Sequence, residues 1–209
     1  MTLQVFCPKW YFQSSLTDDA IKKTNELFDE FVKNDENFHQ PPMWNCNVQS
    51  SWERTPESKG PWTEWVNIIK PVWNEFLETV GARCNIEVVP QNAWVNRYDP
   101  GDSQEMHDHC TPSSNLSMVY FHTLNDDDGC EFVFYNTEHA AYQMQGLSDT
   151  LQSPTQPTTK PSVRSGDVLI FPSHYHHLVT PHRGTKTRIT FSLNFQVYPV
   201  PDYQPAQSS

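Results

Sequence analysis

The chain has 209 residues, and its 25 Asp and Glu against 14 Lys and Arg give a formal net charge of -11 at pH 7. This acidity argues against a nucleic-acid partner, because proteins bind the phosphate backbone with basic surface. The length fits a single domain that buries a sizeable core. Since 13% of the residues are aromatic, Trp, Tyr and Phe are expected to supply much of that core.

Five cysteines are scattered along the chain without a C-x-x-C pair. Their odd number and their spacing predict neither a zinc knuckle nor a disulfide framework. The sequence does not start with a basic segment and an apolar run, and no stretch approaches the roughly 20 apolar residues that span a bilayer. We therefore expect a cytoplasmic protein without a membrane partner. The sequence does not indicate the oligomeric state.

The first 85 residues are predicted to be mainly helical. Thr17 is a good N-cap for a helix that extends to about residue 33, because two acidic residues follow it. Pro61 suits the first turn of a second helix, expected over about 62–80 and kinked or broken at Pro71. Two short strands are also expected, within residues 2–12 and 44–52.

The sequence changes character at residue 86, where short strand-like runs begin to alternate with turn residues. This pattern is typical of an all-β sandwich or barrel. Residues 137–162 are polar and are expected to form a loop insertion, which is either a functional lid or disordered. The expected strands are Ile86–Val89, Ala93–Tyr98, Gln104–His109, Leu116–His122, Cys130–Phe134, Val168–Phe171, His177–Thr180 and Arg188–Tyr198.

Several histidines are placed to bind a metal ion. His107 and His109 are two residues apart on one expected strand, so their imidazoles point to the same face. A third imidazole is available from His174, His176 or His177 at a later strand. Three such ligands form a facial site that leaves coordination positions open for a substrate and dioxygen. The histidine pair alone is a weak indication, because the chain has nine histidines.

The last expected strand alternates almost completely between polar and apolar side chains. Its apolar face should pack into a core. An arginine beside a hydroxyl is suited to hold a carboxylate through charge-assisted hydrogen bonds. The pattern is equally compatible with an arginine that faces solvent on an edge strand. The polar face consists of Arg188, Thr190, Ser192 and Asn194.

Two stretches of the sequence, taken in their order along the chain, resemble stretches of a known enzyme family. The run Arg97–Gly101 reads R-Y-D-P-G and is followed by His107 and His109. It is similar to the R-Y-x-P-G…H-x-D stretch of prolyl-4-hydroxylase-like iron(II)/2-oxoglutarate oxygenases. Gly166–Pro172, with His177 behind it, resembles the strand and turn that carry the distal histidine of that family. The resemblance is nearest to a branch of these oxygenases that is common in marine bacteria and their phages.

The resemblance implies a role for individual residues. His107 and His177 match the two histidine ligands of iron(II) in the family. Tyr98 matches a tyrosine that contacts the co-substrate 2-oxoglutarate. Arg188 matches the anchor of its distal carboxylate, and Thr190 stands where a hydroxyl often assists.

The resemblance, which covers about residues 93–197, also implies a fold. That fold is a double-stranded β-helix, a jelly-roll or cupin-like barrel, with supporting helices outside it. We therefore expect a mostly β single domain over residues 1–209. Its parts are a helical support region over 1–85, a catalytic core over 86–199 with the 137–162 insertion, and a tail over 200–209.

One position departs from the family pattern, because His109 stands where the family has a carboxylate ligand. Three histidines can still form a facial metal site. Alternatively, Asp108 or Asp102 reaches the metal after a local bulge, although strand alternation turns Asp108 away from His107. A third alternative is an open coordination position that admits a halide, which a histidine at that position disfavours. We favour His109 as the third ligand.

The resulting expectation is an iron(II)- and 2-oxoglutarate-dependent oxygenase. With dioxygen, it would hydroxylate a C–H bond of a peptide side chain or a small molecule and release succinate and carbon dioxide. Two other functions are compatible with the residues. One is a cupin-like metal-binding protein without turnover, and the other is a three-histidine dioxygenase that does not use 2-oxoglutarate. Arg188 separates these hypotheses, because only 2-oxoglutarate requires a buried guanidinium at some distance from the metal.

Overall fold

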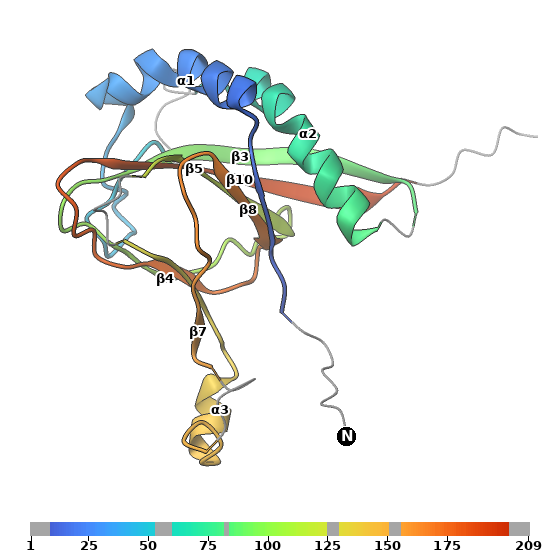
Figure 1. Ribbon diagram of the computed structural model, residues 1–209, viewed down its shortest axis with the longest axis vertical. Coiled ribbons are helices and arrows are strands. Elements are labelled where there is room, and N and C mark those ends of the chain that lie inside the picture. The colour runs from blue at the N-terminus through green and yellow to red at the C-terminus, as the bar shows by residue number, and fades with distance from the viewer. Residues whose placement is uncertain (1–8, 53–59, 82–83, 125–129, 151–155, 201–209) are drawn as a thin grey trace, which may run out of the picture.

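The computed structural model describes residues 9–52, 60–81, 84–124, 130–150 and 156–200. Two antiparallel sheets face each other, and two long helices lie across the outer side of the larger sheet (Figure 1). The prediction of a mostly β fold with N-terminal helices is confirmed, and the two facing sheets form the double-stranded β-helix. Within the described ranges, no helix combines the length and the hydrophobicity that crossing a membrane requires.

The larger sheet has six strands and the smaller sheet has four. The larger sheet, in its spatial order, consists of β1 (Phe12–Ser15), β8 (Asp167–Pro172), β5 (Leu116–Thr123), β10 (Arg188–Pro199), β3 (Ile86–Tyr98) and β2 (Gln49–Ser50). The smaller sheet consists of β4 (Gln104–His107), β9 (His177–Val179), β6 (Phe132–Tyr135) and β7 (Thr158–Thr159).

Both long helices form where the sequence predicts them. Helix α1 (Asp18–Lys33) begins after Thr17, whose hydroxyl accepts a hydrogen bond from the Ala20 amide. Helix α2 (Trp62–Val80) continues through Pro71, so the expected break is wrong. Packing against the sheet on both sides of the proline outweighs the lost hydrogen bond. The residues buried nearest to it are Ile69, Val72 and Trp73.

Several strand boundaries differ from the expected ones. The two strands expected between residues 86 and 98 are one continuous strand, and the strand expected to end at His109 ends at His107. The first strand begins at Phe12. The strand expected within residues 2–12 lies partly outside the described residues, which begin at residue 9. Residues 201–209 also lie outside it.

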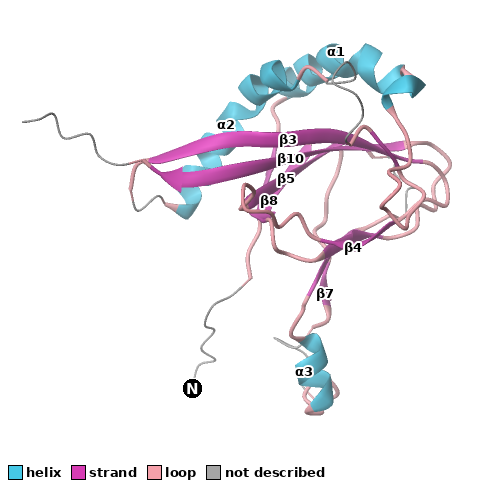
Figure 2. Ribbon diagram, turned by 180° about the vertical axis from the view of Figure 1, so that it is seen from behind, coloured by secondary structure: helices cyan, strands magenta, loops and turns pink. Residues whose placement is uncertain are grey.

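The polar stretch 137–162 contains the short helix α3 (His139–Met144) as well as β7. Strand β7 is an edge strand of the smaller sheet, and α3 lies beyond it, on the side of the molecule opposite to α1 and α2 (Figures 1 and 2). A turn of 3-10 helix (Asp35–Asn37) follows α1.

Strand β10 borders two hydrophobic cores. Its apolar side chains Phe191, Leu193 and Phe195 belong to the core between the helices and the larger sheet, together with Phe28 and Trp65. The second core lies between the sheets. Because β10 is a central strand between β3 and β5, its polar face is buried as well, and Arg188 has no exposed surface. The alternative that Arg188 faces solvent on an edge strand is therefore wrong.

The burial of His122, in β5, leads us to expect that the stability of the fold depends on pH. Its ring stacks on Phe191 with centroids 4.9 Å apart, and burial lowers its pKa from 6.5 to about 4. Between these two values the unfolded chain binds the proton and the folded chain does not. The stabilisation by the neutral ring is therefore fully present above pH 6.5 and is lost as the pH falls toward 4.

The variant His122→Phe keeps the stacked ring and cannot titrate. We expect the free energy of unfolding of the wild type to fall faster with acidification than that of the variant, by about 1 kcal/mol per pH unit between pH 6.5 and 4. Denaturant titrations of both proteins at several pH values measure the difference. Parallel pH profiles would contradict the assignment.

Candidate metal centre

Three histidines converge in the space between the two sheets. His107, His109 and His177 each offer one ring nitrogen, and these nitrogens lie within 4.8 Å of one another. The ring centroids are 4.2 Å apart for His107 and His177, 4.9 Å for His109 and His177, and 5.2 Å for His107 and His109. In the part of the chain that the structure describes, this is the one group of His, Cys, Asp or Glu side chains arranged to hold a metal ion.

The pairing of β4 with β9 sets the positions of two of these side chains. His107 and His177 are direct partners across the two antiparallel strands. His109 lies beyond the end of β4, but its backbone amide donates a hydrogen bond of 2.8 Å to the Ser173 carbonyl. This bond keeps the segment extended, so His109 still turns to the same side as His107.

Backbone carbonyls orient two of the imidazoles. The Nδ1 atom of His107 lies 2.7 Å from the Glu105 carbonyl oxygen, and Nδ1 of His177 lies 2.9 Å from that of Tyr175. A carbonyl oxygen only accepts hydrogen bonds, so Nδ1 carries the proton in both rings. The lone pair is then on Nε2, where it can bind a metal ion.

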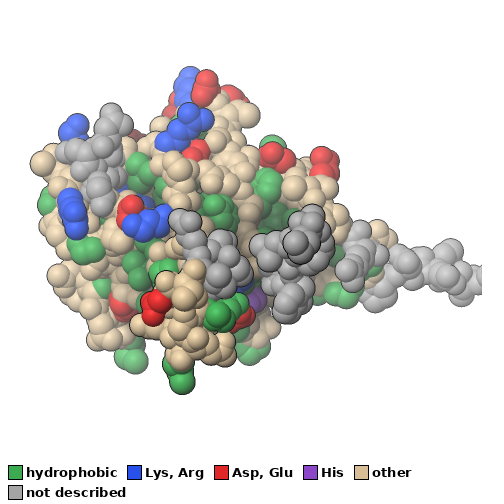
Figure 3. Space-filling view, turned by 60° about the horizontal axis from the view of Figure 1, so that its bottom comes forward, with side chains coloured by type: hydrophobic (Ala, Val, Ile, Leu, Met, Phe, Trp, Pro, Cys, Tyr) green, Lys and Arg blue, Asp and Glu red, His purple; other side chains and the backbone are tan. Residues whose placement is uncertain are grey.

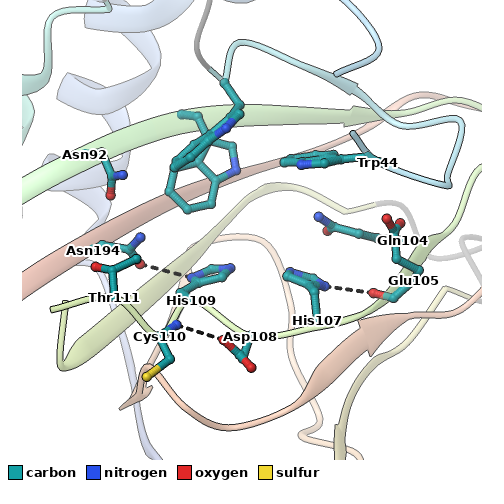
Figure 4. Close-up of a pocket in the computed structure, with 12 residues that line it drawn as sticks. Trp44, Asn92, Gln104, Glu105, His107, Asp108, His109, Cys110, Thr111 and Asn194 are labelled. Carbon is teal, nitrogen blue, oxygen red and sulfur yellow. Dashed lines mark hydrogen bonds between the residues drawn. The ribbon is translucent and has the colours of Figure 1, made fainter. Parts of the chain in front are cut away.

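His109 is oriented by side chains instead. Its Nδ1 lies 3.0 Å from Oδ1 of Asn194 and 3.2 Å from the hydroxyl of Ser117. Ser117 donates a hydrogen bond of 2.8 Å to the same Asn194 oxygen and contacts the Ser173 hydroxyl at 2.8 Å. These groups fix the ring of His109 from behind, with Nε2 directed away from them (Figure 4).

Burial keeps the three imidazoles neutral. It lowers the pKa of His107, lowers that of His109 to about 3 and lowers that of His177 well below 6.5. The neighbouring imidazoles add to the effect on His109 and His177, because each disfavours a positive charge on the next. At neutral pH all three rings therefore have the lone pair that metal binding requires.

Both carboxylates offered by the sequence as alternative ligands are engaged elsewhere. Asp108 accepts a hydrogen bond of 2.9 Å from the Cys110 amide, and its other oxygen lies 3.8 Å from Nε2 of His176. Figure 4 shows its side chain directed away from His107 and His109. Asp102 accepts a hydrogen bond of 2.8 Å from the Asp99 amide inside the turn that precedes β4.

Arg188 is a buried cation that pairs with no carboxylate of the described residues. Its Nη1 donates a hydrogen bond of 2.8 Å to the Cys130 carbonyl, whereas Nε and Nη2 have no hydrogen-bond partner among the described residues. The rings of Tyr98 and Phe121 lie beside it, with centroids 5.6 and 5.7 Å from the guanidinium carbon. Since an unpaired buried charge is costly, these nitrogens fit a carboxylate from a bound ligand.

A small cavity connects Arg188 to the three histidines, and Tyr98 and Thr190 line it. The Tyr98 hydroxyl donates a hydrogen bond of 2.7 Å to Gln104, which also lines the cavity. Burial raises the pKa of Tyr98, so this hydroxyl keeps its proton. The cavity has a volume of about 10 Å³, so a bound diacid requires the lining side chains to move apart.

A second and larger cavity, of about 220 Å³, adjoins His107 and His109 (Figure 4). Three tryptophans line it, of which Trp94 contacts His109 at a centroid distance of 5.2 Å. Trp94 comes from β3, whereas Trp44 and Trp52 stand at the two ends of the segment 44–52, in which the structure has only the short strand β2.

The structure thus brings together the six residues that the sequence favours for the site. His107, His109 and His177 form the cluster, and Tyr98, Arg188 and Thr190 line the small cavity beside it. Sequence reasoning missed several other side chains. Asn194 was identified only as part of a polar strand face, and nothing in the local sequence marks the remaining ones, which are Gln104, Ser117, Trp44 and Trp52.

Comparisons with known proteins agree with this geometry. Residues 92–194, about half of the chain, match the model of a family described as "Putative 2OG-Fe(II) oxygenase". A search of curated protein sequences finds no match.

Many solved structures share the fold at low sequence identity. A prolyl-4-hydroxylase from Pseudomonas putida has a TM-score of 0.56 at 13% identity, over 90% of this chain and 92% of the other. The collagen prolyl hydroxylase of Paramecium bursaria Chlorella virus-1, solved with 2-oxoglutarate, has a TM-score of 0.53 at 15% identity, over 90% and 96%. A prolyl hydroxylase from Trichoplax adhaerens, solved with a peptide fragment of hypoxia inducible factor, has a TM-score of 0.60 at 12% identity, over 89% and 79%.

The family match covers the strands that carry the histidine cluster and Arg188, and the fold is the one that these oxygenases share. The chain therefore belongs to the superfamily of iron(II)- and 2-oxoglutarate-dependent oxygenases.

Proposed function

We propose that this oxygenase hydroxylates a C–H bond of a peptide side chain or a small molecule, and that His107, His109 and His177 hold its iron(II). Arg188 then anchors the distal carboxylate of 2-oxoglutarate, with Tyr98 and Thr190 beside it. A peptide substrate has support from the relatives, since the Trichoplax adhaerens enzyme was solved with a peptide fragment. The separation of the two cavities is compatible with either class of substrate.

The observation that carries this proposal is the partly satisfied Arg188 guanidinium, which lines the same small cavity as the histidine cluster. Two of its nitrogens have no hydrogen-bond partner in the described ranges, although the side chain is fully buried. A carboxylate that binds both nitrogens would satisfy the charge and the hydrogen-bonding capacity together. A dicarboxylate that reaches from Arg188 to the histidines meets this requirement.

Iron(II) and 2-oxoglutarate together supply the activation of dioxygen, in which one oxygen atom enters the substrate and the other enters succinate as carbon dioxide is released. The residues of this chain supply geometry. The three histidines would hold the ion through their neutral ring nitrogens. Arg188 and the Tyr98 hydroxyl would orient the co-substrate.

The same observation argues against the two other functions. A cupin-like protein that only binds a metal, or a three-histidine dioxygenase without 2-oxoglutarate, would leave the Arg188 nitrogens buried and unpaired at a lasting cost in stability. No feature of the described residues repays that cost in the absence of an anionic ligand.

The first prediction concerns the co-substrate itself. Purified protein supplied with iron(II) and dioxygen should convert 2-oxoglutarate slowly to succinate even without a primary substrate. Succinate is quantified by chromatography, and calorimetry with zinc(II) in place of iron(II) measures binding without turnover. Absence of 2-oxoglutarate binding in the metal-loaded protein would refute the proposed function.

The second prediction separates the roles of two residues. The variant His177→Ala should lose metal binding, because only two of the three imidazole ligands remain. Arg188→Ala should keep the metal and lose most of its affinity for 2-oxoglutarate, because only the carboxylate anchor is removed. Metal content by elemental analysis and 2-oxoglutarate affinity by calorimetry give the two readouts. Arg183→Ala, at an exposed arginine nearby in sequence, is the control. Equal loss of metal in both site variants would contradict the roles.

The third prediction concerns Asn194, which holds the ring of His109 through its Oδ1. Removing a group that orients a metal ligand typically costs about 10- to 100-fold in metal affinity. We expect a loss in this range for Asn194→Ala in a competition assay with a chelating dye. Asn92→Ala is the matched control, since Asn92 lines the larger cavity without contacting a histidine. Unchanged metal affinity in Asn194→Ala would argue against His109 as a ligand.

A further inference from the structure

The larger cavity has aromatic walls next to the histidine cluster. Trp44, Trp52 and Trp94 line it, and Figure 4 shows Trp44 on the side of His107. The rings of Trp52 and Trp94 meet edge to face with centroids 4.5 Å apart. Trp94 is 3% exposed, and its Nε1 has no hydrogen-bond partner among the described residues. A buried, unpaired N–H at a cavity wall indicates that a ligand or a water occupies the space.

The charges on this cavity are of one sign. Among the described residues, Glu105 and Asp108 line it, and no Lys or Arg does. Neither carboxylate forms a salt bridge with a Lys or Arg in the described part of the chain. Asp108 lies 3.8 Å from Nε2 of His176 and accepts a hydrogen bond from the Cys110 amide, and Glu105 accepts one from the Asn45 amide. On the face shown in Figure 3, Lys and Arg are interspersed with Asp and Glu and form no continuous basic patch. The whole chain carries a net charge of -11.

We propose that the primary substrate carries an organic cation, an ammonium group on an aliphatic stem, which sits among the three tryptophans with Glu105 and Asp108 as its counter-charges. The faces of aromatic rings attract cations, and tryptophan does so most strongly. Carboxylates at the rim of the same cavity raise the local concentration of cations and repel anions. This inference rests on the proposed function, because it assigns a substrate class to the site beside the proposed metal.

The size and place of the cavity agree with such a ligand. Its volume of about 220 Å³ is below the range of about 300–1,000 Å³ that is typical for drug-sized ligands. It therefore fits one side chain or one small metabolite. Because Trp94 contacts His109, an ammonium group held at the tryptophans places the adjoining aliphatic stem toward the histidines. The C–H bonds near the charged end are then the ones presented to the metal position.

The test compares two probes of the same shape. Choline has a positively charged nitrogen at its branch point, where 3,3-dimethyl-1-butanol has a neutral carbon. Quenching of tryptophan fluorescence and calorimetry measure the binding of each probe to the full chain, without metal or 2-oxoglutarate. We expect choline to bind about tenfold more tightly, the ratio that a cation–π contact with nearby counter-charges supports. The preference should shrink in high salt, because salt screens the carboxylates.

Variants locate the binding. Glu105→Gln and Trp44→Leu should each weaken choline binding several-fold, with little effect on the neutral probe for Glu105→Gln. Glu78→Gln on the outer side of α2 and Trp10→Leu are matched controls at exposed positions, and both should bind choline like the wild type. Asp108→Asn provides a second charge variant in case Glu105→Gln does not fold.

Two further probes identify the source of the cation. n-Butylammonium stands for a free amine, and Nα-acetyl-lysine N-methylamide carries the same group on a peptide unit. Tighter binding of the lysine derivative indicates that the substrate is a peptide side chain, and tighter binding of the free amine indicates a small metabolite. Either outcome supports the proposal that the substrate carries an organic cation.

Equal affinity for choline and its neutral counterpart, or no measurable binding of either, would overturn the proposal. Because these assays need neither metal nor 2-oxoglutarate, that result leaves the proposed function standing if 2-oxoglutarate is still bound and converted. Conversely, failure to bind 2-oxoglutarate alongside selective choline binding would remove the proposed oxygenation and keep the cation site.

Discussion

Burial of one face of β10 under the two helices fixes the direction in which the polar side chains of its other face point. Phe191, Leu193 and Phe195 pack against α1 and α2, and alternation then turns Arg188 and Asn194 into the space between the sheets. A slip of the strand by one residue would turn the apolar side chains into the space between the sheets and remove both polar groups from the site. The hydrophobic core on the helix side therefore sets the register on which the chemistry depends.

The proposed metal centre differs from a site with two histidines and one carboxylate in its charge. A third neutral imidazole leaves the bound ion with one negative charge less in its immediate surroundings. The oxygen atoms of Asn194 and Ser117 behind His109 partly compensate, because an acceptor at Nδ1 makes the imidazole a better electron donor at Nε2. In the proposed centre, a neutral ligand that is supported by a buried polar network would take the place of a charged one.

The two cavities beside the histidines have opposite electrostatic character. Arg188 makes the small cavity a place for a carboxylate, whereas Glu105 and Asp108 make the larger one favourable for a cation. Both adjoin His107 and His109. Such a division would keep the acidic co-substrate and the proposed cationic substrate from competing for the same space, and it would bring both to the same group of imidazoles.

The sequence by itself determined the features that repeat along the chain. The spacing of His107 and His109 places both on one side of a strand, and the alternation from Arg188 to Asn194 separates a polar face from an apolar one, because the strand period is two. The capping residue Thr17 likewise located the start of α1. These signals are local, so they survive without knowledge of the partner strands.

Only the tertiary structure decided which distant groups meet. The pairing of β4 with β9 selected His177 from three neighbouring histidines, and the central position of β10 buried Arg188. The packing of α2 on the sheet carried the helix through Pro71, and chain segments before residue 60 brought Trp44 and Trp52 to the larger cavity. These outcomes depend on strand register and on contacts between residues far apart in the chain, which no local period encodes.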